Sequence, residues 1–196
     1  IYERNIKSQI LKLINLNIKK NKKYNHLLRV AVKKNIISIS IRNKIKTQKN
    51  FNLKIINYKR IKPEYKNLKY KIILKHLSKL DPSKSDIALV VNNKILESGT
   101  SNLLFVSKNK IFSPINNFYK GTSIRFFEKK VKIIKKNIFL KKVNDFDEII
   151  LVGSGKGVTS IKQIEEIKWS KKSDKIYKKL LFIYNREIKK QKNIFN

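Results

Sequence analysis

Glu97 is the residue whose setting in the sequence points most directly to chemistry. The polar turn from Ser98 to Asn102 follows it, and two apolar runs, Asp86 to Val91 and Leu103 to Val106, lie on either side. Both runs are predicted to be strands, because they are short, rich in aliphatic residues and bounded by turn residues. A carboxylate that a tight turn holds between two strands is fixed in position, as is needed to set an acid beside a cofactor.

Two short turns of small residues follow further along the chain. Gly121 to Ser123 comes immediately before a predicted helix, and Gly153 to Gly155 follows a predicted buried strand. Backbone N–H groups, hydroxyls and the positive end of a helix can together bind a dianion such as a phosphate. Short Gly-Ser turns are common in proteins, so the support for an anion site comes from the two turns together.

The order of these features resembles that of the class IV aminotransferases, the fold-type IV enzymes that use pyridoxal 5'-phosphate (PLP). The segment from Glu97, E-S-G-T-S-N-L-L-F-V, is similar to the family's E-G-x-x-S-N-hydrophobic signature. Upstream, the segment from Lys66 to Tyr70, K-N-L-K-Y, is similar to the family's K-[ST]-L-N-[YR] pattern. Among members of the family, the chain most resembles 4-amino-4-deoxychorismate lyase.

The resemblance implies a role for each of these segments. PLP needs an amine for its aldehyde, an acid beside its ring nitrogen and a cradle for its phosphate. By resemblance, Lys66, which follows a linker and is predicted to begin a helix, forms the Schiff base and then moves the Cα proton as a general base. Glu97 keeps the ring nitrogen protonated. The residues that the resemblance assigns to the phosphate are Thr122, Ser123, Ser154 and Gly155.

Two arginines and one lysine extend this assignment. The N-terminal segment I-Y-E-R, which ends at Arg4, is similar to the family's H-x-x-R segment and makes Arg4 a predicted phosphate ligand, although isoleucine stands in place of the histidine. The family's G-I-T-R turn has its arginine where this chain has Ile124, and Arg125 follows one residue later. Arg125 and Lys156 are candidates to bind a substrate carboxylate, and solvated surface cations are the alternative for both.

The resemblance favours a lyase over a transaminase. The compact length and the form of the Lys66 segment are closer to 4-amino-4-deoxychorismate lyase, which releases pyruvate and leaves 4-aminobenzoate for folate synthesis. Branched-chain aminotransferases usually carry a longer G-T-A-A-E-[VI]-T-P turn where this chain has Gly153 to Thr159. Branched-chain and D-amino-acid aminotransferases stay as alternatives, because they share the cofactor site. The family also implies an amino-acid-like or chorismate-derived substrate and a homodimer.

The composition argues against several other kinds of site. Cysteine is absent, so the chain has no disulfide framework, thiolate metal site or cysteine nucleophile. With only His26 and His76, a histidine metal cluster is not expected, and no metal is predicted. No apolar run approaches the roughly 20 residues that span a bilayer, and no signal peptide opens the chain. A soluble, cytoplasmic protein is therefore expected.

The charge of the chain is extreme, with 48 Lys and Arg residues against 13 Asp and Glu residues and a formal net charge of +35. Such a charge would suit nucleic acid or an anionic membrane. The basic residues are mostly lysines spread along the whole length, and they accompany many Ile and Asn residues, as an AT-rich coding sequence would produce. We therefore expect solvated surface rather than a specific nucleic-acid or membrane partner. A basic nucleic-acid-binding protein and an inactive remnant of the fold are the alternatives of other classes.

The hydrophobic pattern predicts a mixed α/β (α+β) chain, and fold-type IV implies two domains. Residues 1–62 are predicted to form a small N-terminal domain, residues 63–84 a linker and helix that carry Lys66, and residues 85–196 a large cofactor-binding domain. Family members have several dozen residues before the Arg4 segment, so the N-terminal part of the small domain is expected to be missing. The predicted helices are 4–20, 68–80, 123–136 and 173–190, and the predicted strands are 27–32, 36–41, 51–58, 87–91, 94–96, 103–106, 110–112 and 149–152.

Overall fold

The computed structural model describes residues 2–17, 26–33 and 36–192, which form two compact units, Ile1–Lys44 and Ile45–Asn196. The first unit contains helix α1 (Tyr2–Asn17) and the antiparallel strands β1 (His26–Lys33) and β2 (Ile36–Asn43). Their register pairs Val30 with Ile39 and Val32 with Ile37, so aliphatic side chains share one face of the hairpin. Within the unit, α1 packs against β2. The predicted turn between the strands includes residues 34–35, which lie outside the described residues.

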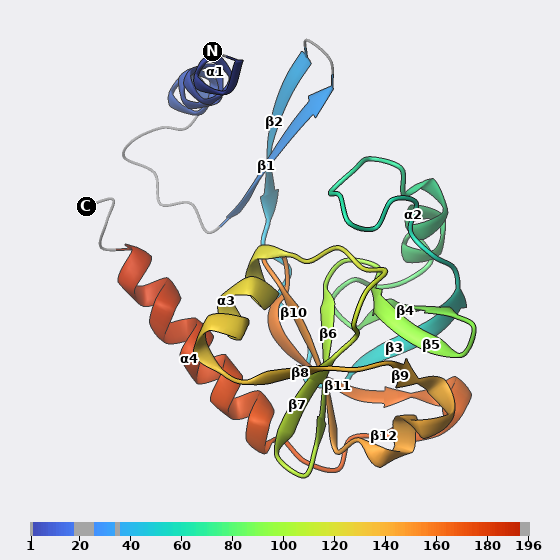
Figure 1. Cartoon of the computed structure of the whole chain (residues 1–196). Coiled ribbons are helices and arrows are strands. Elements are labelled where there is room, and N and C mark those ends of the chain that lie inside the picture. The colour runs from blue at the N-terminus through green and yellow to red at the C-terminus, as the bar shows by residue number, and fades with distance from the viewer. Residues whose placement is uncertain (1, 18–25, 34–35, 193–196) are drawn as a thin grey trace. The chain divides into compact units, whose positions relative to one another are not determined.

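Among its described residues, the second unit holds a ten-stranded sheet in the order β8-β7-β6-β10-β11-β3-β4-β5-β9, with β12 beside β11 (Figure 1). Its strands are β3 (Phe51–Asn57), β4 (Ser85–Val91), β5 (Lys94–Ser98), β6 (Asn102–Ser107), β7 (Lys110–Ser113), β8 (Ile133–Lys135), β9 (Ile138–Phe139), β10 (Glu148–Gly153), β11 (Gly157–Ile164) and β12 (Trp169–Ser170). Its helices are α2 (Lys71–Leu77), α3 (Thr122–Lys130) and α4 (Lys175–Lys192), with short 3₁₀ turns η1 (Leu140–Asp145) and η2 (Glu165–Ile167).

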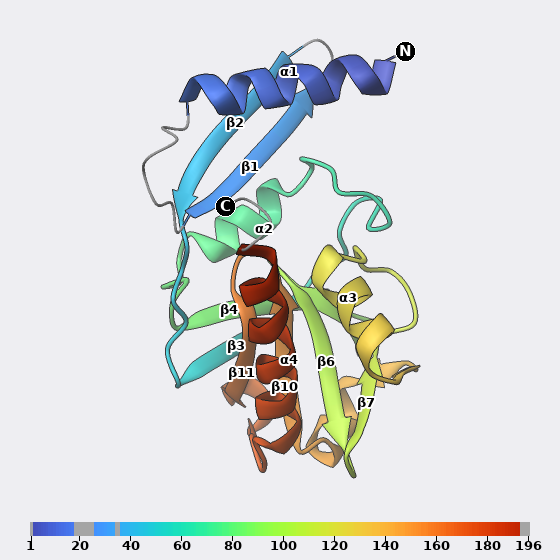
Figure 2. The ribbon, with the colours of Figure 1, turned by 90° about the vertical axis from the view of Figure 1, so that its left-hand side faces the viewer.

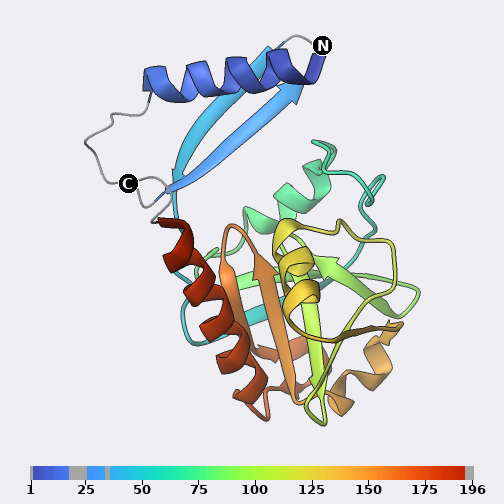
Figure 3. The ribbon, with the colours of Figure 1, turned by 60° about the vertical axis from the view of Figure 1, so that its left-hand side comes forward.

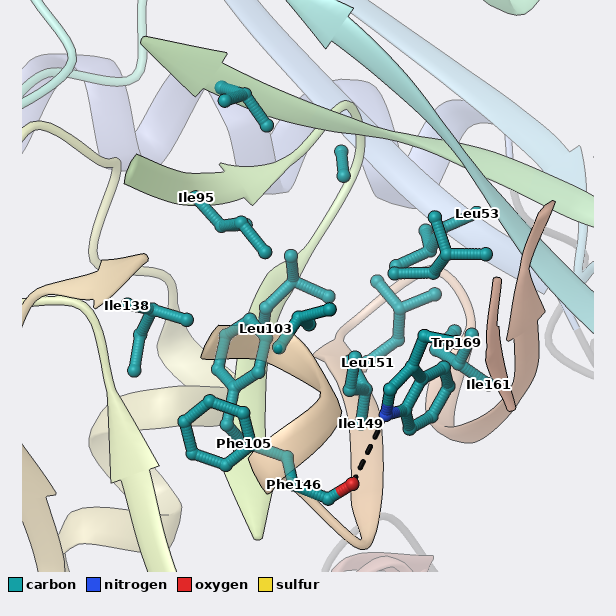
Figure 4. Close-up of a cluster of buried hydrophobic side chains, with 14 of the residues drawn as sticks. Leu53, Ile95, Leu103, Phe105, Ile138, Phe146, Ile149, Leu151, Ile161 and Trp169 are labelled. Atoms are coloured by element: carbon teal, nitrogen blue, oxygen red, sulfur yellow. Dashed lines mark hydrogen bonds between the residues drawn. The ribbon is translucent and has the colours of Figure 1, made fainter. Parts of the chain in front are cut away.

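The central strands are buried on both faces, which explains their continuous apolar sequences. Along β10, Ile149 and Leu151 point into a cluster that the curved sheet surrounds, while Ile150 and Val152 face α3 and α4. Figure 4 shows the first cluster, in which Leu151 lies near Trp169. Figures 2 and 3 show α4 running beside β10, with α3 near β6 on the same side. This two-sided burial makes the ends of β6 and β10 rigid supports for the turns that follow or precede them.

Helix α2 covers the outer face of β3 and β4. Ile73 of α2 packs with Ile87 and Leu89 of β4 in a third buried cluster. The predicted helix over 68–80 is therefore confirmed in part, although it begins only at Lys71. The residues ahead of it, including Lys66, form turns, so the prediction that Lys66 begins a helix is wrong.

The boundary between the units differs from the one expected at residue 62. Strand β3 pairs in parallel with both β4 and β11, so Phe51–Asn57 belongs to the large sheet. The first unit accordingly ends at Lys44. The sequence of β3 identified it as a strand but contained no information on which sheet it would join, because parallel partners are distant in the chain.

The helix predicted over 123–136 is shorter than expected. Helix α3 ends at Lys130, and Val131 already has extended backbone angles. Residues Ile133–Lys135 instead form β8, which pairs in parallel with β7. Ile134 of β8 satisfies the helical spacing used for the prediction, and pairing with the sheet edge overrides that local preference.

The sequence predicts hairpin turns at Asn92–Asn93 and at Lys108–Asn109, and the structure has a tight hairpin at each. Asn92 and Asn93 have φ values of 48° and 60°, and Lys108 and Asn109 have values of 49° and 60°. Positive φ at both central residues matches the right-handed twist of the flanking strands, and asparagine tolerates it better than most residues. None of the helices in the described part of the chain is long and apolar enough to cross a membrane.

Trp169, the only tryptophan in the chain, reports on the core of the second unit. It is 1% exposed, and its Nε1 donates a hydrogen bond to the Phe146 carbonyl at 3.1 Å (Figure 4). We expect Trp169→Phe to lower the unfolding free energy by about 2 kcal/mol, because it leaves a cavity and an unpaired carbonyl. Urea titration followed by circular dichroism measures this, with the exposed Phe182→Leu as control. Equal stability of the two variants would contradict the burial of Trp169.

Candidate active site

Glu97 lies at the end of β5, and its carboxylate is buried. The residue is 3% exposed, and its Oε1 accepts a hydrogen bond from Arg60 Nε at 2.9 Å. Arg60 also donates from Nη2 to the Gly99 carbonyl at 3.2 Å, so one guanidinium holds both the carboxylate and the turn that follows it. The second oxygen, Oε2, accepts from the Tyr119 N–H at 3.4 Å. The sequence identified Glu97 but not Arg60, which lies 37 residues earlier in the chain.

The electrostatics of Glu97 reflect its burial. Removal from water raises the pKa of the Glu97 carboxyl above its ordinary value of 4.5, and the Arg60 guanidinium and the Tyr119 N–H offset this only in part. The Oε2 atom has one long hydrogen bond, so it can still accept a short one from a further donor. A ring N–H is such a donor.

Lys66 lies near Tyr119, the residue whose N–H donates to Glu97. Its Nζ is 5.9 Å from the centroid of the Tyr119 ring, and its side chain is exposed. Asn67 fixes the turn around it, because the Asn67 amide donates to the Ile61 carbonyl at 2.8 Å and accepts from the Lys69 N–H at 2.8 Å. The structure thus brings the predicted amine and the predicted acid to the same residue, Tyr119.

Asn102 joins the turn after Glu97 to the segment that precedes α3. Its Nδ2 donates to the Tyr119 carbonyl at 2.7 Å, and its Oδ1 accepts from the Gly121 N–H at 3.1 Å. A Cβ on Gly121 would lie 3.0 Å from the same oxygen, so the close approach favours glycine. We name residues Ser98–Asn102 the signature turn. Asn102 was recognised as part of a motif, but its bridging role follows only from the structure.

The start of α3 is the first of the two predicted anion sites. Thr122 and Ser123 are its first two residues, and their N–H groups have no acceptor within the helix. Ser123 is buried and Thr122 is exposed. Gly121 is the N-cap residue, and the helix begins at Thr122, one residue before the start predicted at 123. Arg125 is exposed, and its Nε donates to the Lys120 carbonyl at 3.2 Å, close to this helix end.

The second predicted anion site, which we name the glycine turn, comprises Gly153–Gly157 between β10 and β11. A Cβ on Gly153 would lie 2.4 Å from Ser101 Oγ, so the glycine turn packs directly against the signature turn. Ser154 is exposed and Gly155 is partly exposed, so both are accessible to a ligand. Lys156 is buried instead, with Nζ 3.0 Å from Asp86 Oδ2. Its role toward a substrate carboxylate stays a prediction, and Asp86 already engages its ammonium group.

These contacts place the signature turn between the two predicted anion sites. Asn102 binds the segment before α3, and Ser101 touches the glycine turn. Strand pairing explains the arrangement, since β6 begins at Asn102 beside Val152 of β10. Arg4 belongs to α1 in the first unit, and its side chain is outside the described part of the structure. No cluster of acidic, histidine or cysteine residues suited to a metal occurs among the described residues.

Replacing Arg60 by methionine would leave the Glu97 carboxylate buried without its cationic partner. At neutral pH we expect the unfolding free energy to fall by about 3 kcal/mol, as for other broken buried ion pairs. Without the guanidinium, the pKa of Glu97 rises further above 4.5 in the folded protein. The loss should therefore shrink as the pH falls through the pKa of the variant toward that of the wild type, because the folded variant takes up the proton more readily than the folded wild-type protein.

Urea titrations over this pH range measure the effect of Arg60→Met. Arg125→Met removes an exposed guanidinium and is the matched control, for which we expect a change within about 0.5 kcal/mol at every pH. A loss for Arg60→Met that does not vary with pH would contradict the assigned interaction with Glu97.

Comparison with known proteins gives the same family as the sequence motifs. The model of the family described as amino-transferase class IV matches residues 6–164. Comparison with curated protein sequences gave no match. Solved structures give many matches, and three of them show the range of similarity.

A branched-chain aminotransferase from Thermoproteus uzoniensis is similar to 93% of the chain and to 70% of its own length, with 13% identity and a TM-score of 0.74. For the branched-chain aminotransferase of Thermobaculum terrenum in its PLP form, these shares are 78% and 56%, with 16% identity and a TM-score of 0.61. For 4-amino-4-deoxychorismate lyase from Pseudomonas aeruginosa, they are 72% and 58%, with 14% identity and a TM-score of 0.60.

At these identities the similarity establishes the fold, which is the mixed α+β architecture expected from the motifs. The chain spans 56% to 70% of the length of the three structures. The family model covers well over half of the chain and includes Lys66, Glu97 and both small-residue turns. The chain therefore belongs to the class IV aminotransferase family.

Proposed function

We propose that the chain is a PLP-dependent enzyme, and specifically a 4-amino-4-deoxychorismate lyase that releases pyruvate and leaves 4-aminobenzoate. The observation that carries the cofactor assignment is the buried Glu97 carboxylate, whose Oε2 accepts only a 3.4 Å hydrogen bond among the described contacts. The exposed Lys66 amine lies 5.9 Å from the centroid of the Tyr119 ring. An acid and an amine that both contact one aromatic residue, with two predicted anion sites nearby, suit the chemical groups of PLP.

The residues present fit this cofactor group by group. Lys66 would hold its aldehyde, Glu97 would keep a proton on its ring nitrogen, and the helix end at Thr122 and Ser123 would face its phosphate. Ser154 and Gly155 would add donors from the glycine turn. Arg4 is also proposed as a phosphate ligand, on the family resemblance alone. Bound PLP supplies an electron sink for the charge that develops at the substrate Cα.

The chain's own residues then have separate tasks in the reaction. The Lys66 amine would remove the proton at Cα, and in the lyase reaction that proton is not returned there, because the product 4-aminobenzoate is aromatic. The amine is exposed and, among the described contacts, lies only against the Tyr119 ring. Arg60 favours the ionised form of Glu97 against its desolvation, and that form is the one suited to hold the ring proton. Arg125, near the start of α3, is a candidate to orient a substrate carboxylate.

The lyase assignment is supported by the compact length of the chain and by the form of the Lys66 segment. A branched-chain or D-amino-acid aminotransferase is the second candidate. It is favoured by the Thermoproteus uzoniensis aminotransferase, whose structure is similar to 93% of the chain. We also propose a homodimer, as the family resemblance implies. Assays for 4-aminobenzoate and pyruvate, against assays for amino-group transfer, separate the two reactions.

Lys66→Ala tests the cofactor assignment. When PLP is added to the wild-type protein, we expect an absorbance band between roughly 330 and 430 nm, and borohydride reduction should convert the C=N bond responsible for it into a stable secondary amine that fixes the cofactor to the protein. Digestion and mass analysis should then locate the reduced cofactor on Lys66. In Lys66→Ala the permanent label should be lost while the far-ultraviolet circular dichroism is unchanged, because the exposed side chain contributes little to packing.

Lys69→Ala is the matched control, since Lys69 is an exposed lysine three residues further along. It should retain the reducible band. Labelling of Lys66→Ala at the wild-type level would refute the role of Lys66. Absence of the band in the wild-type protein would refute the proposed cofactor.

A further inference from the structure

Asp86 and Lys156 form a buried ion pair beside the candidate site. Their side chains are 0% and 4% exposed, and Lys156 Nζ lies 3.0 Å from Asp86 Oδ2. The pair joins the start of β4 to the glycine turn, across 70 residues of sequence. Neither residue has a task in the chemistry proposed above.

The Asp86 carboxylate also binds the signature turn. Its Oδ2 accepts a hydrogen bond from Thr100 Oγ1 at 2.5 Å, and Ser98 Oγ lies 3.3 Å from the same atom. Its Oδ1 accepts from the Ile87 N–H at 2.7 Å, which orients the carboxylate. One buried carboxylate therefore connects the glycine turn, through Lys156, to the signature turn, through Thr100.

The two turns are packed too closely to move independently. Besides the contact of Gly153 with Ser101, a Cβ on Gly99 would lie 2.7 Å from Ile87 Cγ1 and 3.0 Å from Asp86 Oδ1. Each close approach is possible because the residue is glycine. A change in the position of Asp86 would consequently shift both turns.

The ammonium of Lys156 has several partners within the protein. Besides Asp86, it lies 3.5 Å from the Ser85 carbonyl and 4.8 Å from the centroid of the Phe51 ring. A buried ion pair loses hydration energy that its mutual attraction often only offsets, so apolar residues in its place can be equally stabilising. Apolar contacts are not directional, whereas the hydrogen bonds of a charged pair are. The Asp86–Lys156 pair can therefore fix the positions of the two turns relative to each other.

We propose that the Asp86–Lys156 pair sets the distance between the two ends of the cofactor site. The inference rests on the proposed function. The signature turn follows Glu97, which would meet the ring nitrogen, and Lys156 follows Ser154 and Gly155, which would meet the phosphate. The ring and the phosphate of PLP are joined through a short linker, so their protein partners must stand at a matching separation. Asp86 and Lys156 are positioning residues that act through the two turns.

The double variant Asp86→Asn/Lys156→Met tests this role. It removes both charges together and retains side chains of similar length, whereas each single variant would leave an unpaired buried charge. The matched control is Asp174→Asn/Lys171→Met, which makes the same two substitutions in a partly exposed pair with Nζ and Oδ1 2.6 Å apart. A second, milder variant, Thr100→Val, removes only the hydroxyl that binds Asp86.

Dissociation constants for PLP and for pyridoxal, which lacks the phosphate, are to be compared by absorbance titration. In the double variant we expect PLP to bind at least about tenfold more weakly, as when other supporting interactions are lost, and pyridoxal to change less than about twofold. Thr100→Val should show a smaller change of the same kind, and the control pair none. Unchanged PLP affinity in the folded double variant and in Thr100→Val, or an equal loss for both ligands, would overturn the proposal.

Hydrogen exchange of the cofactor-free protein separates this proposal from the proposed function. In the double variant the amides of Ser98–Asn102 and Ser154–Gly157 should exchange faster, while those in the centres of β6 and β10 keep their protection. If exchange is faster in the double variant but the wild-type protein binds no PLP, the connection between the two turns is supported and the proposed cofactor is refuted. Unchanged exchange in both turns, in the double variant and in Thr100→Val, would refute the connection itself.

Discussion

The arrangement of the candidate site depends on the side-chain amide of Asn102. Its two hydrogen bonds, to the Tyr119 carbonyl and from the Gly121 N–H, use both ends of one planar group. They fix the segment before α3 against the turn after Glu97. Because the Tyr119 N–H reaches Glu97 and the Tyr119 ring lies beside Lys66, one amide aligns the predicted acid, the predicted amine and the helix end. The strand β6 supports this amide from within the core.

Buried carboxylates in this chain show why Glu97 is the one suited to a ligand. Glu148, which is 1% exposed, accepts the N–H of Ile176 at 2.9 Å and that of Tyr177 at 2.7 Å, so both of its oxygens are bound at the start of α4. The two oxygens of Asp86 are likewise occupied. Glu97 has one well-bound oxygen and one with a single long contact. Of these three residues, it alone combines burial with capacity for a further hydrogen bond.

Local sequence was enough to predict the parts of the fold whose pattern is strong. The aliphatic runs of β4 and β10 and the Asn-rich hairpin turns were predicted correctly, because burial on both faces and positive φ leave clear marks in sequence. Strand β11 was missed, since Thr159, Ser160 and Gln163 interrupt its apolar pattern. At the site, the motifs indicated Glu97 and both turns. Arg60 and Asp86 were missed because their partners are 37 and 70 residues away, and only the order of the strands brings them together.

The large positive charge makes geometry, rather than charge, the source of any selectivity for a phosphate. With a net charge of +35, the chain attracts every polyanion, and salt weakens that attraction. Many exposed lysines attract a phosphate about equally, so none of them provides selectivity. Backbone N–H groups at the start of α3 and in the glycine turn are different, because the surrounding fold fixes their directions. Recognition of one phosphorylated cofactor therefore requires the rigid contacts among the signature turn, the glycine turn and α3, and the surrounding lysines add attraction without preference.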